Sequence, residues 1–361
     1  MIYLKPIPLE TLDDLRAAVQ QAVFLEHYTI PPYLTANFTL YNTGNDDIYN
    51  LIGSIVGEEM LHMSISSNLL TAIGGNPIIN KPPFIPIYPH CLPGGVEGSL
   101  IVPIKKFSLD LVQNAFMVIE EPENIIPIEA VEDQLTIGMF YDNINDLMTR
   151  LEKEAQANGA TIFTGDPASQ MTFPAFFPEK MLFPITDLAT ASRGINIIVD
   201  QGEGTTKDPF VADDDDPTTT PEPAHYYRFK EIVKGKQLVV DPNAPSGFSF
   251  TGDPVPYIDG SIPNMPDNPK MADYPVNSQA YLNSKLFNYT YTSLLNSLHR
   301  AFNGEPNEIN TAMGLMFSVR LYALKLLATT DPNNPAQVCG PSYEYVTDED
   351  LTTAEQEALK G

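Results

Sequence analysis

The sequence has little cysteine and no long apolar segment. Its 361 residues include two cysteines, Cys91 and Cys339, which are too few for a disulfide framework or a cysteine-based zinc site. Spacing alone does not say whether the two pair with each other. No segment approaches the roughly 18 uninterrupted apolar residues of a membrane-spanning helix, and the N-terminal run MIYLKPIPLETLDDLR lacks the apolar stretch of a signal peptide. We therefore expect a soluble, cytoplasmic protein.

Positive charge is also scarce. The chain has 20 basic and 46 acidic residues, which gives a formal net charge of −26. Such a surface is repelled by nucleic-acid phosphates and by anionic membranes, so we expect neither a nucleic-acid nor a membrane partner. The simplest interpretation of the excess charge is solubility, and attraction for cations is the functional alternative.

Proline is abundant, but it is concentrated between residues 77 and 103, 166 and 184, and 209 and 276, where we expect long ordered loops. Apolar residues spaced by threes and fours predict helices outside these loops. We expect an all-α protein, because these patterns are too long and regular for a β-protein. The expected helices cover residues 9–28, 47–73, 109–120, 135–155, 187–201, 225–232, 278–302 and 308–328, with one short strand near 100–104. Pro31 and Pro32 are expected to kink or end the first helix.

Ionisable residues interrupt two of the apolar stripes. In the first helix the stripe that contains Val19 and Ala22 continues to Glu26, and in the second helix Ile52 and Ile55 are followed on the same face by Glu59 and His62. Burying a carboxylate without a partner is costly. We therefore expect these three ionisable side chains to have partners inside the protein.

Glu59 and His62 form a Glu-x-x-His pair in the run EEMLHM. In carboxylate-bridged two-metal bundles, two helices each supply a Glu and two others each supply such a pair, all pointing inward. Carboxylate and imidazole ligands suit iron or manganese, and zinc is chemically compatible. The alternative is purely structural: the buried acids pair with Arg193 or Arg228, or join a hydrogen-bond network, and no metal binds.

Several segments together resemble a known family. The runs LEHYTIPPYL, GEEMLHMSISSNLLTAIGGNP, IEEP, TIGMFY, QGEG and AHYYRF resemble the ferritin-like family that includes the N-terminal part of the iminophenyl-pyruvate dimer synthases of violacein and rebeccamycin biosynthesis. The resemblance covers most of residues 10–235. It implies a ferritin-like four-helix bundle core with additional helices and long proline-rich loops. We expect one such domain over residues 1–335, with the C-terminal helices packed on it, and a loop and tail over 336–361.

The resemblance also implies a set of metal ligands. Carried over by position, these are Glu26, Glu59 and His62, followed by Glu203 of QGEG and His225 of AHYYRF. An insertion of 21 residues separates the last two, and it weakens their expected pairing. The Asp213–Asp216 run within this insertion is predicted to be a solvated loop.

One position departs from the family pattern. Relatives often have TIGEFY where this chain has TIGMFY, so Met139 replaces a glutamate. If that glutamate binds metal, the protein holds only one ion, or Glu120 takes its place from an inward-facing position after Phe116. Glu58 is expected outside the ligand shell, and His27 is expected to pack elsewhere.

Two functional hypotheses follow from the resemblance. In the first, the protein is an oxidoreductase that uses iron, or alternatively manganese or zinc, on a small organic substrate of secondary metabolism. In the second, it is a non-catalytic metal-binding or structural partner of a biosynthetic oxidase. Ferritin-like relatives often self-associate, so a homo-oligomer is compatible with either.

Overall fold

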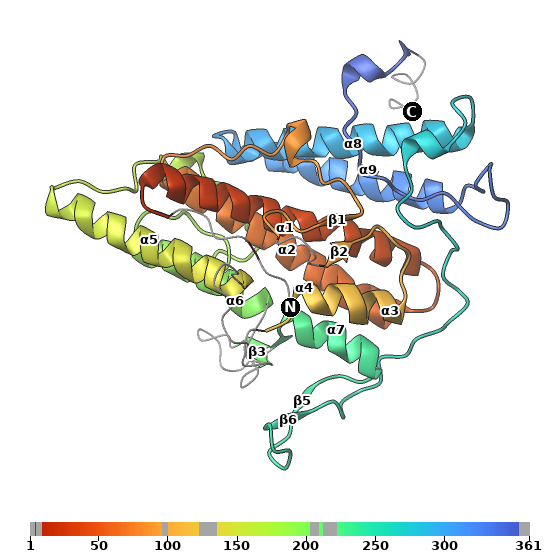
Figure 1. Ribbon diagram of the computed structural model, residues 1–361, viewed down its shortest axis with the longest axis horizontal. Coiled ribbons are helices and arrows are strands. Elements are labelled where there is room, and N and C mark those ends of the chain that lie inside the picture. The colour runs from red at the N-terminus through yellow and green to blue at the C-terminus, as the bar shows by residue number, and fades with distance from the viewer. Residues whose placement is uncertain are drawn as a thin grey trace.

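The computed structural model describes residue 4 and residues 9–95, 100–122, 136–202, 209–211 and 222–353. Two long antiparallel helices run through its centre, α1 (Leu12–Leu40) and α2 (Asp46–Ala72) (Figure 1). Helix α1 begins at a capping box in which Thr11 and Asp14 bond each other's backbone N–H groups. Helix α2 ends before Gly74, whose positive φ of 74° suits a residue without Cβ.

Helix α1 continues 12 residues beyond the expected end at residue 28, so of the two predicted effects of Pro31 and Pro32, a kink or an end, the end was wrong. Pro32 cannot donate to the carbonyl oxygen of Tyr28, four residues earlier. The hydroxyl of Tyr88 donates to that oxygen instead, at 2.6 Å. A side chain from a distant loop thus replaces the missing backbone hydrogen bond.

The remaining helices lie near their expected positions and confirm the all-α class. They are α3 (Leu109–Leu111), a π-helical turn at Val112–Phe116, α4 (Met117–Ile119), α5 (Ile137–Ala157), α6 (Leu188–Gly202), α7 (His225–Lys234), α8 (Gln279–Phe302) and α9 (Ile309–Leu327). Strand structure among the described residues is limited to three two-stranded antiparallel ribbons. These pair β1 (His90–Cys91) with β2 (Ile101–Val102), β3 (Phe210–Val211) with β4 (Glu222–Pro223), and β5 (Val239–Val240) with β6 (Phe248–Ser249).

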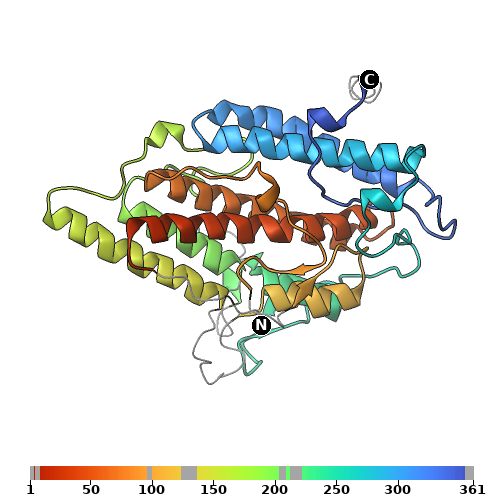
Figure 2. The ribbon, with the colours of Figure 1, turned by 45° about the horizontal axis from the view of Figure 1, so that its top comes forward.

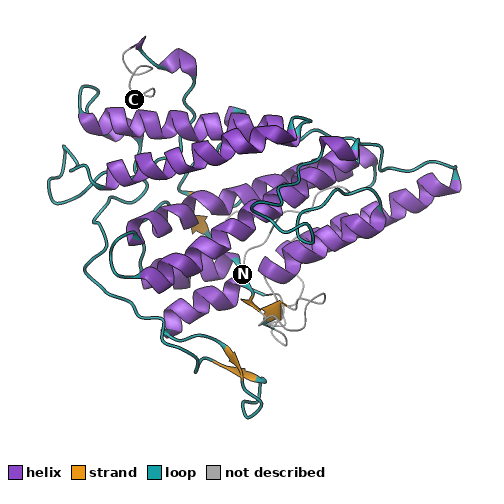
Figure 3. Cartoon of the chain, turned by 180° about the vertical axis from the view of Figure 1, so that it is seen from behind, coloured by secondary structure: helices purple, strands orange, loops and turns teal. Residues whose placement is uncertain are grey.

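The helices form layers on both sides of the α1–α2 pair. Helices α8 and α9 pack against each other and cover one side, whereas α5, α6, α7 and the α3–α4 segment cover the other (Figures 1 and 2). On that second side α5 and α6 lie toward one end of the long pair, and α3–α4 and α7 lie toward the other end. Figure 3 shows the same layers from behind, with the proline-rich loops running over the surface.

The second layer is therefore interrupted near its middle. Helix α4 and helix α6 both end there, and α5 and α7 both begin there. The 21-residue insertion expected between the fifth and sixth helices falls at this break, between α6 and α7. Consequently the side chains near these four helix ends face the middle of α1 and α2.

One large apolar core joins the layers, and it is filled mainly by residues of α1, α2, α8 and α9 together with the loop segments between them. No helix among the described residues is long and apolar enough to cross a membrane. Cys91 and Cys339 are both free thiols, and Cys339 is buried.

Candidate metal centre

Five ionisable side chains meet at the break in the second layer. They are Glu26 of α1, Glu59 and His62 of α2, Glu120 directly after α4, and His225 at the start of α7. All five are buried, with between 0% and 7% of each residue exposed. Such burial of three carboxylates in one place requires either cations or shared protons.

The five residues form two groups that share Glu59. Glu26, Glu59 and His62 make the first group, and Glu59, Glu120 and His225 make the second. In each group one potential ligand atom per residue lies within 4.8 Å of the others. This is the geometry in which one carboxylate can bridge two neighbouring ions.

Each carboxylate has one oxygen tied by a hydroxyl group. Tyr141 donates to Oε1 of Glu26, Thr29 donates to Oε2 of Glu59 at 2.8 Å, and Tyr33 donates to Oε1 of Glu120 at 2.5 Å. The other oxygen of each carboxylate is the one that lies nearest a histidine Nδ1. The three hydroxyl groups therefore fix the carboxylates with one oxygen of each directed inward.

The two histidines are held in the same manner. Nε2 of His62 lies 2.9 Å from Oε1 of Gln201, and Nε2 of His225 lies 2.7 Å from Oε2 of Glu58. Nδ1 of His62 then lies 3.5 Å from Glu26, and Nδ1 of His225 lies 2.9 Å from Glu59. Metal-binding histidines are typically oriented by such a partner on the distal nitrogen.

Nδ1 of His225 is a buried atom without an aligned hydrogen bond, despite the short distance to Glu59. An unpaired buried nitrogen is unfavourable in a purely structural network. A metal ion between this nitrogen and the inward oxygens of Glu59 and Glu120 would satisfy all three atoms. The orphaned nitrogen thus fits a metal-binding role.

Glu58 supports His225 from outside the two groups. It accepts a hydrogen bond from Arg228, whose Nη1 also donates to Ser54 at 3.0 Å. Burial alone raises the pKa of Glu58, but the hydrogen bond with His225 and the charge of Arg228 outweigh it and lower the pKa to about 2. Glu58 is therefore ionised at neutral pH and can orient the imidazole.

Protons compete with cations at the centre. Burial and the negative charge of Glu120 raise the pKa of Glu59 to about 7, against the opposing influence of His225. Burial lowers the pKa of His225, but the nearby carboxylates of Glu120, Glu58 and Glu59 outweigh this effect and raise the pKa well above its ordinary value. Without metal, the cluster thus retains protons that a cation would displace.

The space between these residues is small. The described residues enclose a cavity of about 40 Å³, lined by acidic, histidine and apolar side chains that include Leu25, Leu92 and Ile119. On this measure a cavity needs roughly 10–15 Å³ to hold one water molecule. The cavity accommodates ions and small ligands, and it is too small for an aromatic substrate.

The structure brings together five of the six residues predicted as ligands. Glu203 lies outside the described residues, as do Asp213–Asp216. Met139 is 41% exposed on the outer side of α5, away from the centre, so a glutamate at this position would not reach the cluster. Glu120 instead takes part in the second group, as the sequence allowed. The predicted alternative partner Arg228 pairs with Glu58 and not with Glu26 or Glu59.

Sequence reasoning missed most of the supporting residues. The roles of Thr29, Tyr33 and Gln201 depend on contacts between helices that no local spacing reveals. Glu222 stands three residues before His225 and completes a second Glu-x-x-His by sequence. It lies in β4, with 72% of its side chain exposed, and does not join the cluster. The spacing places two residues on one face only within a helix.

Comparisons with known proteins identify the family and the fold. A family described as ferritin-like matches residues 19–234. A crystal structure of a ferritin-like protein from Caulobacter vibrioides superposes with a TM-score of 0.60 at 21% sequence identity, covering 94% of this chain and 100% of that chain. At that identity the likeness shows the fold alone. A search of curated proteins found no match.

Proposed function

We propose that this chain, which belongs to the ferritin-like family, holds two metal ions and uses them as an oxidoreductase acting on a small molecule. One ion would be held by Glu26, Glu59 and His62, and the other by Glu59, Glu120 and His225. Iron is the metal we expect, because ferritin-like bundles with such carboxylate and histidine ligands bind iron or manganese. Zinc is compatible with the donor atoms.

One observation carries the proposal. Each of the five side chains has one polar atom anchored by a hydrogen bond and another directed to the centre. A structural network would be expected to pair all of its polar atoms with one another. Here the anchored atoms face outward and the unanchored ones converge, which is the arrangement of preorganised ligands.

The remaining residues of the centre position groups and hold protons. Burial and the nearby carboxylates Glu26 and Glu120 raise the pKa values of Tyr141 and Tyr33 well above 10, so both phenols keep their protons and donate to those carboxylates. The apolar side chains around the small cavity exclude bulk water. A bound redox metal would supply one-electron chemistry that no amino acid side chain here provides.

A role in secondary metabolism, and a relationship to the iminophenyl-pyruvate dimer synthases in particular, remain predictions from the sequence segments. An amino-acid-derived imine is the substrate class that they suggest.

The activity can be tested with the metal-loaded chain. We expect protein loaded anaerobically with Fe²⁺ to consume O₂ faster than the same concentration of free Fe²⁺ in an oxygen electrode. Glu120→Gln should lose this rate, whereas Glu152→Gln should keep it, because Glu152 is a buried glutamate bonded to Thr161 and Ile162 outside the centre. A wild-type rate equal to that of free iron would contradict the oxidoreductase proposal without contradicting metal binding.

The small cavity favours one alternative, a non-catalytic metal-binding partner of a biosynthetic oxidase. A space of about 40 Å³ accommodates ions and small ligands but not an aromatic substrate. In that case the loaded protein would bind metal without O₂ consumption. Met139 does not bear on this alternative, since that residue lies outside the centre.

A further inference from the structure

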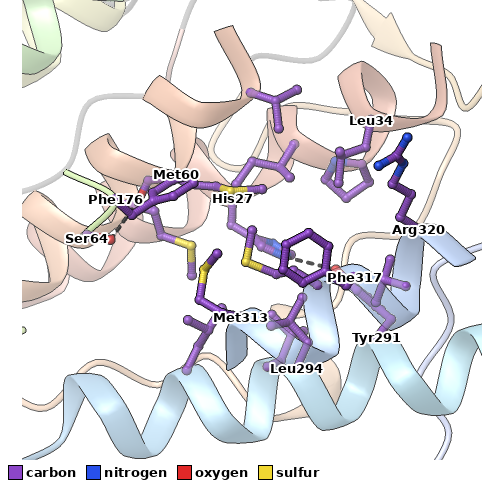
Figure 4. Close-up of a pocket in the computed structure, with 18 of the residues that line it drawn as sticks. His27, Leu34, Met60, Ser64, Phe176, Tyr291, Leu294, Met313, Phe317 and Arg320 are labelled. Carbon is purple, nitrogen blue, oxygen red and sulfur yellow. Dashed lines mark hydrogen bonds between the residues drawn. The ribbon is translucent and has the colours of Figure 1, made fainter. Parts of the chain in front are cut away.

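A second, much larger cavity lies on the opposite side of α1 and α2 from the metal centre. Its volume is about 280 Å³, against about 40 Å³ for the cavity of the metal centre. It is enclosed by α1, α2, α8, α9 and the loop around residues 171–177 (Figure 4). It shares no lining residue with the small cavity of the metal centre.

The walls of this cavity are apolar and adaptable. Representative lining residues are Leu34, Met60, Phe176, Leu294, Met313 and Phe317. Five of the chain's 12 methionines line it, and methionine side chains adjust readily to different apolar ligands. Two of these large apolar side chains are exposed to solvent, Phe317 by 66% and Phe176 by 45%. They come from different parts of the fold. Exposed aromatic side chains beside an apolar cavity are typical of a binding site.

Most polar groups along the walls are already satisfied. Asn37 donates to the carbonyl oxygen of Tyr49 at 2.6 Å, and Ser64 donates to that of Met60 at 2.7 Å. Nε2 of His27 and the hydroxyl of Tyr291 bond each other at 2.9 Å, whereas Nδ1 of His27 is buried without a hydrogen-bond partner. Burial lowers the pKa of His27 to about 3, so its imidazole is neutral. These groups are uncharged, so none of them favours a charged ligand.

Arg320 differs from these groups because it is charged. Among the described lining residues it alone carries a permanent charge. Its guanidinium lies 4.7 Å from the ring of Tyr41, its Nε is buried without a hydrogen-bond partner, and it makes no ion pair with any described residue. Arg300, by contrast, pairs with Glu305 and Glu308. An arginine without a carboxylate partner is notable in a chain with 46 acidic residues.

We propose that this cavity binds an amphipathic organic acid, with the apolar body between the two helix pairs and the carboxylate on Arg320. The guanidinium forms charge-assisted hydrogen bonds with a carboxylate. A single arginine in a protein of net charge −26 favours a monoanion over a multiply charged phosphate. The proposal goes beyond the metal centre and does not depend on it.

Isothermal titration calorimetry with decanoate and with 1-decanol distinguishes the contribution of the apolar cavity from that of Arg320. We expect wild-type protein to bind both, decanoate more tightly. Arg320→Gln should weaken decanoate binding by about tenfold or more and leave 1-decanol unchanged, because only the carboxylate uses the charge. Arg300→Gln, an exposed arginine elsewhere on the protein, should change neither.

A cavity-filling variant tests the location. Met313→Trp should abolish binding of both ligands, and Met316→Trp serves the same purpose if the first variant does not fold by circular dichroism. Chelator-treated wild-type protein should bind decanoate with the same affinity as untreated protein, so failure of the metal centre would leave this result intact.

The proposal is overturned if wild-type protein binds no decanoate, or if decanoate affinity is unchanged in Arg320→Gln or in a folded cavity-filling variant. It is also overturned if the cavity is covered by a second copy of the chain. Sedimentation velocity would then show a dimer that Phe317→Ser dissociates.

Discussion

Substitution of Glu59 should have opposite effects on two properties: it should stabilise the metal-free protein and abolish metal binding. Its carboxylate belongs to both ligand groups and is 3% exposed. In metal-free protein, burial and the charge of Glu120 raise its pKa from 4.5 to about 7. The ionised carboxylate is therefore unfavourable in the folded state until a cation binds, and we expect Glu59→Gln to remove this cost along with the metal.

The size of the effect follows from the pKa. Each pKa unit corresponds to about 1.4 kcal/mol, so the change from 4.5 to about 7 corresponds to on the order of 3 kcal/mol. When a group has a higher pKa in the folded state than in the unfolded state, its protonation stabilises the folded protein. This contribution is fully present below the unfolded-state pKa and is lost as the pH rises through the folded-state pKa. The cost of Glu59 is consequently small at pH 5 and fully present at pH 8.

The assay is urea unfolding of metal-free protein at both pH values. Relative to wild type, Glu59→Gln should gain up to about 3 kcal/mol in free energy of unfolding at pH 8 and much less at pH 5. Glu152→Gln provides the matched control. Glu152 accepts hydrogen bonds from Thr161 and from the backbone of Ile162, so its loss should destabilise the protein at both pH values.

The same variant should lose the response to metal. A ligand at about one hundred times its dissociation constant stabilises a protein by about 2.7 kcal/mol. We expect Mn²⁺ to raise the melting temperature of wild type and of Glu152→Gln but not that of Glu59→Gln. The reasoning is refuted if Glu59→Gln is destabilised at pH 8 as much as at pH 5, or if it keeps the full metal response.

Changes of pH, of Glu58 and of Met139 have further expected outcomes. Mn²⁺ affinity, measured by calorimetry, should weaken by about tenfold from pH 8 to pH 6, because Glu59 takes up a proton near pH 7; a pH-independent affinity would contradict this. Glu58→Gln should weaken Mn²⁺ binding about 10- to 100-fold, because His225 loses the carboxylate that orients it. In metal-free protein this variant should also unfold more easily at pH 7 by on the order of 3 kcal/mol, a difference that shrinks as the pH falls from 4.5 toward 2; equal sensitivity at pH 3 and pH 7 would refute it. Met139→Glu should leave the metal content of purified protein unchanged, since Met139 is 41% exposed, and an added ion per chain would show that the position belongs to the centre.

Much of the fold was predictable from local patterns. Apolar periodicity located the helices to within a few residues. The apolar stripe on α2 correctly predicted that Glu59 and His62 face the interior. The first helix was the exception, because the hydroxyl of Tyr88 compensates for Pro32. Such compensation depends on a residue 56 positions away, which no local rule describes.

The centre was predictable only in part, for a related reason. Glu26, Glu59 and His62 lie on regular helices whose faces can be read from spacing. Glu120 and His225 stand at helix ends: spacing from Phe116 allowed an inward Glu120 without requiring it, and spacing did not assign His225 to the site. His225 was predicted as a ligand only from the family resemblance, and its partner Glu58 became evident only in the three-dimensional structure.

The content of metal per chain tests the central claim most directly. Elemental analysis should be made on protein purified without chelators and reconstituted with Fe²⁺ under anaerobic conditions, for wild type, Glu59→Gln and Glu152→Gln. Two ligand groups sharing Glu59 predict about two ions per chain in wild type and in Glu152→Gln, and fewer than one in Glu59→Gln. Wild-type protein without metal, or a Glu59→Gln variant with the same content as wild type, would contradict the account.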